Sequence, residues 1–146
     1  MELGYAPKSK LMDIEELRDY CLSKPETTED FPFDENTIVF KVEGKIFALT
    51  SLKKWEAGDH SLNLKCDPEK AVEYREKYPN VIFPGYHANK KHWNTVVVDN
   101  SQLSPKLIKD LINHSYELVV SKLPKYKREV LLCLLGSQTS SFYSGK

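Results

Sequence analysis

Apolar residues recur at helical spacing in four stretches of the chain. The first stretch, residues 13–23, begins with Asp13 and Glu16, whose spacing of three is typical of a capping box. Proline and glycine, which interrupt helices, mark the ends of three of the four stretches. The other three predicted helices cover residues 67–79, 104–119 and 124–136.

Alternation of apolar and polar residues predicts the strands. TIVFKV and KIFALTSL, residues 37–42 and 45–52, are joined by a Glu-Gly turn and predict a hairpin. FPF at 31–33 is expected to form a short edge strand, because proline would interrupt a central one. Further strands are predicted over residues 61–66, 81–86 and 92–99.

This order of elements predicts the fold class. Runs of consecutive strands, followed by helices, are typical of an α+β domain in which helices pack on one face of an antiparallel sheet, in two layers. We expect a loose leader over residues 1–11, the domain over 12–129, and an apolar helix end with a flexible tail over 130–146.

The charge of the chain is uneven although its formal net charge is zero. Residues 13–35 contain nine acids and two bases, a net charge of −7, and residues 36–146 sum to +6. Such a dipolar protein can present a basic face to a polyanion. The longest apolar run, VLLCLL, has six residues, far short of the roughly 20 needed to span a bilayer. No signal peptide is visible, and we expect a cytoplasmic protein.

The most unusual stretch is VIFPGYHANKKHWNTV, residues 81–96, which concentrates histidine, lysine, asparagine and tryptophan without an acid. Its two histidines lack the further ligands that a metal needs, and no paired carboxylates or activated nucleophile indicate catalysis. An ordinary turn, with Asn89 in the left-handed conformation and Trp93 in the core, is one interpretation. Contact with nucleic acid is the other, with lysines on phosphates and the remaining side chains hydrogen-bonding or stacking.

On the nucleic-acid interpretation the contacting residues share one loop, and two lysines of the predicted hairpin extend the footprint. The loop residues are His87, Asn89, Lys90, Lys91, His92, Trp93 and Asn94, and the hairpin residues are Lys41 and Lys45.

The chain also resembles the MmcQ/YjbR family of small bacterial proteins, from about Met12 to Arg128. PGYHANKKHWNTV carries the resemblance, together with KVEGKIFAL, NLKCDPEKAVEYREKYP and LINHSYELVVSKLPK in the expected order. The resemblance implies a compact α+β fold similar to frataxin-like and secretion-chaperone-like architectures, with a double-wing arrangement and a DNA-binding role. The motif residues that match are Pro84, Gly85, His87, Asn89, Lys90, His92, Trp93 and Asn94.

Together these observations favour a non-enzymatic protein without cofactor or metal that binds double-stranded DNA, as a monomer or weak homodimer. The likeness to frataxin raises iron binding by the acidic residues 13–35 as an alternative, because carboxylates are suitable ligands for iron. The likeness to secretion chaperones raises a protein-interaction module as a second alternative.

Overall fold

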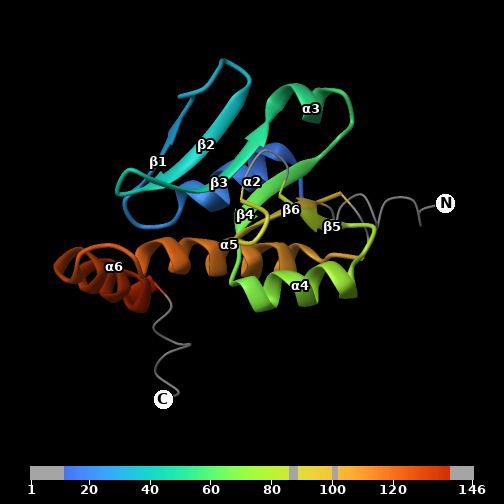
Figure 1. The fold of residues 1–146 in the computed structure, drawn as a ribbon. Coiled ribbons are helices and arrows are strands. Elements are labelled where there is room, and N and C mark those ends of the chain that lie inside the picture. The colour runs from blue at the N-terminus through green and yellow to red at the C-terminus, as the bar shows by residue number, and fades with distance from the viewer. Residues whose placement is uncertain (1–11, 86–88, 100–101, 139–146) are drawn as a thin grey trace.

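The computed structural model describes residues 12–85, 89–99 and 102–138, and the side chains of the last helix as far as Leu134. The expected leader, residues 139–146 of the expected tail and His87 therefore lie outside the described residues. The chain forms one antiparallel sheet in the strand order β1-β2-β3-β4-β6-β5 (Figure 1). The strands are β1 (Thr27–Asp30), β2 (Thr37–Val42), β3 (Lys45–Ser51), β4 (Ser61–Lys65), β5 (Ile82–Pro84) and β6 (Trp93–Val97). The helices are α2 (Ile14–Leu22), α3 (Leu52–Glu56), α4 (Pro68–Lys77), α5 (Pro105–Val120) and α6 (Lys125–Gln138).

Local sequence explains where several of these elements begin and turn. Asp13 and Glu16 form the expected capping box at the start of α2, each accepting the backbone N–H of the other. Glu43 and Gly44 join β2 to β3 with φ angles of +51° and +81°, the left-handed pair that a tight hairpin needs. The predicted hairpin is therefore confirmed.

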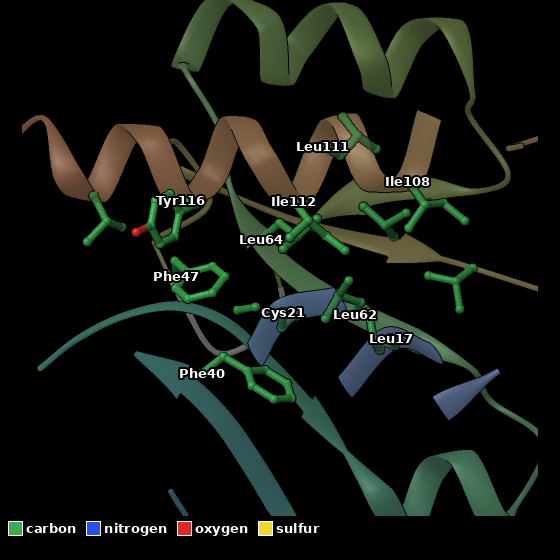
Figure 2. Close-up of a cluster of buried hydrophobic side chains, with 14 of the residues drawn as sticks. Leu17, Cys21, Phe40, Phe47, Leu62, Leu64, Ile108, Leu111, Ile112 and Tyr116 are labelled. Atoms are coloured by element: carbon green, nitrogen blue, oxygen red, sulfur yellow. The ribbon is translucent and has the colours of Figure 1, made fainter. Parts of the chain in front are cut away.

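The hydrophobic core lies between the sheet and α2 and α5 (Figure 2). Leu62 and Leu64 project from β4 towards Ile112 of α5, and all three side chains are almost fully buried. The rings of Phe47 and Tyr116 meet edge to face, with centroids 5.3 Å apart and planes at 88°. This packing confirms the predicted α+β class, an antiparallel sheet with helices.

Register shows which side of the sheet the other helices contact. Asn94 is paired with Leu64 and therefore points to the core side, where Arg75 of α4 contacts it. Trp55 of α3 donates its indole N–H to Thr50, which is paired with the buried Ile38. The opposite face, which carries alternate residues of the same strands, is left uncovered by these helices.

Three sequence predictions differ from the structure. The edge strand is Thr27–Asp30 and not FPF, because Pro32 has no N–H to pair and both flanking phenylalanines are exposed. The short helix α3 was not expected. Its five residues are too few for a periodic signal, and it is fixed by the Ser51 cap and by burial of Trp55. The last helix continues past Gly136 to Gln138.

His114 connects the middle of α5 to the start of α4. Its Nε2 accepts the backbone N–H of Asp67, 3.1 Å away, which requires a neutral imidazole. Burial, assisted by Lys70, lowers the pKa of His114 below its ordinary value, and Asp67 and Glu117 oppose the shift. Folding is therefore favoured by the neutral form of this residue.

The lowered pKa of His114 predicts a pH-dependent stability. The unfolded chain binds this proton more tightly than the folded chain does. The contribution of His114 to stability is therefore fully present above the ordinary histidine pKa of about 6.5, and it is lost as pH falls through the lower pKa of the folded state. We expect a smaller free energy of unfolding in urea at pH 5.5 than at pH 7.5. His114→Gln, whose amide oxygen can still accept from Asp67, should reduce that difference. An undiminished difference would assign it to other groups.

Candidate nucleic-acid interface

The lysine-rich loop joins β5 to β6 at one edge of the sheet (Figure 1). Its described residues begin at Asn89, because residues 86–88 fall outside the description. The carbonyl oxygen of Asn89 accepts the N–H groups of His92 and Trp93, at 3.0 and 2.9 Å. Its side-chain oxygen accepts the N–H of Lys91 at 2.9 Å. Asn89 therefore builds the turn through its side chain, as an Asx turn does.

One detail of the turn interpretation differs in the structure. Trp93 is half-buried and lies on the uncovered face, paired with Lys65. The Lys65 ammonium is 5.9 Å from the centroid of the indole ring. The indole of Trp93 is therefore partly accessible to solvent where the loop meets β6, and it is not part of the hydrophobic core.

Lys90, Lys91 and His92 are all exposed. Within the described ranges, no ion pair joins either lysine to a carboxylate. The acidic start of the first helix lies away from them, because Asp13 lines a hollow together with His60 and Asp99, at the other end of β4 and β6 from the loop. The loop therefore presents two adjacent positive charges to solvent.

Arg75 of α4 holds the loop from the core side. Its Nε donates to the side-chain oxygen of Asn94 at 2.7 Å, and one terminal nitrogen donates to the carbonyl oxygens of Lys90 and Trp93, the latter at 3.3 Å. One planar guanidinium thus joins the turn, the start of β6 and the helix. Sequence reasoning missed Arg75, since it lies 15 residues or more before its partners and no local pattern marks it.

Gly85 closes the other side of the loop. Its N–H donates to the carbonyl oxygen of Trp93 at 2.8 Å. A Cβ atom at this position would lie 2.7 Å from the Trp93 Cβ and 2.9 Å from its carbonyl oxygen. The glycine is therefore required by close packing of two backbones.

Asn94 and Lys41 do not have the environment expected of contact residues. Asn94 is only 4% exposed, faces the core side and is bound to Arg75, so it positions the loop and cannot reach a base. Lys41 lies in β2 and its ammonium is 3.0 Å from Asp30, which offsets its charge. The structure therefore places Asn94 inside the domain and pairs Lys41 with an acidic residue.

Other cations lie near the loop. β3 and β6 run in the same direction with β4 between them, so Lys45 and the loop are at the same end of the sheet, two strand spacings or about 10 Å apart. Lys65 and Lys122 line a hollow of about 310 Å³ together with His92. Sequence reasoning did not select Lys65, because only strand pairing brings it to the loop.

Neither a cluster of metal ligands nor a membrane-spanning helix occurs in the described part of the chain. That part contains no group of three His, Cys, Asp or Glu side chains placed to hold a metal ion. In the acidic segment, Glu29 instead forms an ion pair with Arg18, with an N–O distance of 2.6 Å. None of the described helices combines the length and apolar character needed to cross a bilayer.

The fold and loop define a small α+β protein whose open antiparallel sheet carries a stiffened cationic loop at one edge. The YjbR family model matches residues 22–118, and the chain belongs to this family. It is 36% identical to the uncharacterised protein YjbR of Escherichia coli strain K12 over 123 residues, which cover 84% of this chain and all of that protein. It is 45% identical to the uncharacterised protein YbdF of Escherichia coli O157:H7 over 95 residues, which cover 65% and 74% of the two chains.

Solved structures agree with this assignment. The crystal structure of Deinococcus radiodurans protein DR2400, domain DUF419, has a TM-score of 0.75 and 38% identity, and the match covers 83% of this chain and 88% of that one. A crystal structure of a Pseudomonas syringae protein has a TM-score of 0.61 and 30% identity, with 73% and 98% covered. The family expected from the sequence is thereby confirmed.

Proposed function

We propose that this protein is a non-enzymatic, cytoplasmic DNA-binding protein that holds double-stranded DNA with little sequence preference. One observation carries the proposal: Lys90 and Lys91 are exposed, without a carboxylate partner in the described chain, on a loop that Arg75 and Asn89 hold in place. Paired ammonium groups suit phosphate oxygens, and contact with them releases counterions from the duplex.

The hydrogen bonds of residues 89–93 support the proposal. A backbone that is already held in place loses less conformational entropy on binding than a free one. Five hydrogen bonds from Arg75 and around Asn89 fix the backbone that carries the two lysines. The lysines therefore meet a phosphate backbone with little further ordering of the main chain.

The distribution of charge supports the same surface. Lys45, Lys65 and Lys122 extend the positive charge along the end of the sheet where the loop lies. The acidic start of α2 lies at the other end of β4 and β6 from the loop, since Asp13 lines a hollow together with His60 and Asp99, and β1 is the edge strand opposite β5. Since Asn94 is buried, the loop has few side chains to read base edges, and phosphate contacts by themselves carry no sequence information.

The test is a fluorescence-anisotropy titration of a duplex at several salt concentrations. Lys90→Ala/Lys91→Ala should weaken binding and make the slope of log K against log salt shallower by roughly 0.9 for each lost phosphate contact. The matched control is Lys106→Ala/Lys109→Ala, which removes the same charge from α5. Both lysines are exposed, and neither lines the loop.

The control separates direct contact from total charge. Equal losses in both double variants would show that only net charge matters, and the loop assignment would be wrong. Wild-type affinity and slope in a folded Lys90→Ala/Lys91→Ala protein would also reject it.

A further inference from the structure

A hollow of about 540 Å³ lies beside the loop, on the face of the sheet opposite the core, with Lys54 of α3 in its lining. Strand register places Asn63, Thr95 and Phe83 in one row across β4, β6 and β5. The volume is within the range of small-molecule binding sites. Charged side chains complete the lining: Lys54, Asp59 and Lys90.

Asn63 provides hydrogen-bond donors to this hollow. The Thr95 hydroxyl donates to the Asn63 side-chain oxygen at 2.6 Å, which fixes the orientation of the amide. Among the described residues the amide nitrogen of Asn63 has no hydrogen-bond partner. Every buried side-chain nitrogen or oxygen of the described residues does have a partner, so this nitrogen is not buried. The nitrogen is therefore accessible to solvent, and its two hydrogens can bind an acceptor atom of a ligand.

Phe83 provides an aromatic surface. Its side chain is 40% exposed, although it lies in a strand and not in a loop. Nucleic-acid bases stack on exposed aromatic side chains of this kind, with little dependence on which base is present. Donor and ring thus line one site, as they do where proteins hold a base outside a duplex.

The charges favour one orientation of a nucleotide. Lys90 lines the hollow at the end where the loop lies, so a phosphate is attracted there. Asp59 lies at the other end, where its N–H donates to the carbonyl oxygen of Lys54 at 2.8 Å, and its carboxylate can accept a hydrogen bond from the amino group of adenine, cytosine or guanine. The base is therefore expected towards Asp59 and the phosphate at Lys90.

We propose that this hollow binds one unpaired nucleobase, stacked on Phe83 and hydrogen-bonded by Asn63, in a strand that the lysine loop holds by its phosphates. The inference deepens the proposed function and rests on it for the phosphate contacts. An intact duplex would bind through the loop alone, because its bases are stacked and paired. Single-stranded DNA, or a duplex with one bulged base, would use both the loop and the hollow.

The test compares three labelled probes by fluorescence anisotropy: an intact duplex, the same duplex with one bulged adenine, and the single strand. Wild type should bind the bulged and single-stranded probes about tenfold more tightly than the duplex, as expected for one stacking contact. Phe83→Leu should remove that preference and leave the duplex affinity unchanged. Phe33→Leu, which alters an exposed phenylalanine in the turn before β2, is the matched control and should change nothing.

A second variant tests the same hollow in case Phe83→Leu does not fold. Asn63→Asp retains an acceptor for Thr95 but removes the amide hydrogens and adds a negative charge, so it should also remove the preference. Equal affinity of wild type for all three probes, or a preference that survives in folded Phe83→Leu and Asn63→Asp, would overturn the inference.

The two proposals fail separately. Loss of duplex binding in Lys90→Ala/Lys91→Ala, with no effect of Phe83→Leu, would leave the loop and reject the hollow. As a probe that needs no duplex, deoxyadenosine monophosphate should shift the amide NMR signals of Asn63 and Thr95 in wild type. Shifts from this nucleotide, with unchanged duplex binding in the lysine variant, would support the hollow and reject the loop.

Discussion

Arg75→Met should lower the free energy of unfolding by about 3 kcal/mol, because it removes hydrogen bonds from a charged donor to three acceptors. Asn94 would be left buried with its side-chain oxygen unsatisfied, which is the more costly part of the change. The loop would also lose its connection to α4, so DNA affinity should fall although both lysines remain. Urea unfolding and duplex titration of the same variant measure the two effects.

Lys77→Met provides the comparison on the same helix. Lys77 is exposed and its described contact is with the ring of Tyr78, 5.7 Å from the ammonium, so its loss should cost well under about 1 kcal/mol. Replacing both partners, in Arg75→Met/Asn94→Leu, should restore part of the stability, since no buried polar atom is then unpaired. A single Arg75 variant no less stable than Lys77→Met would show that the guanidinium does not hold the loop.

Local sequence predicted most of the elements because their signals are local. The capping pair at Asp13, the Glu43–Gly44 turn and the alternation in β4 all depend on neighbouring residues, and the structure confirms each of them. The order of strands in the sheet, in contrast, depends on residues that are far apart in the sequence. β6 lies between β4 and β5, and its pairing with β4 joins residues about 30 positions apart.

The candidate site was predictable only in part for the same reason. Exposure of Lys90 and Lys91 follows from their place in a turn, and the structure agrees with it. The burial of Asn94 follows from which face of β6 is directed to the core, and its polar side chain is accommodated there by Arg75, which lies far away in the sequence. The hollow beside Phe83 depends on three strands in register, and no single segment of the sequence indicates it.

Gly85→Ala should cost about 2 to 3 kcal/mol of stability through overpacking. Its added Cβ would meet the Trp93 Cβ at 2.7 Å, the carbonyl oxygen at 2.9 Å and the carbonyl carbon at 3.1 Å. All three atoms are fixed to the Trp93 backbone, so the contact is relieved only if β5 and β6 separate. That movement would also stretch the Gly85–Trp93 hydrogen bond and shift the indole, so both the urea midpoint and the tryptophan emission should change.

Gly44→Ala separates this packing effect from the loss of glycine's conformational freedom. Gly44 has a φ of +81° but open space around its Cβ position, so alanine there should cost only about 1 to 2 kcal/mol of backbone strain. It should leave the emission of Trp93 unchanged, because none of the described contacts of Trp93 involves the β2–β3 turn. Gly85→Ala could instead cost no more stability than Gly44→Ala and leave the tryptophan emission unaltered. That result would show that the close approach of β5 and β6 does not hold the loop, and that Arg75 alone holds it.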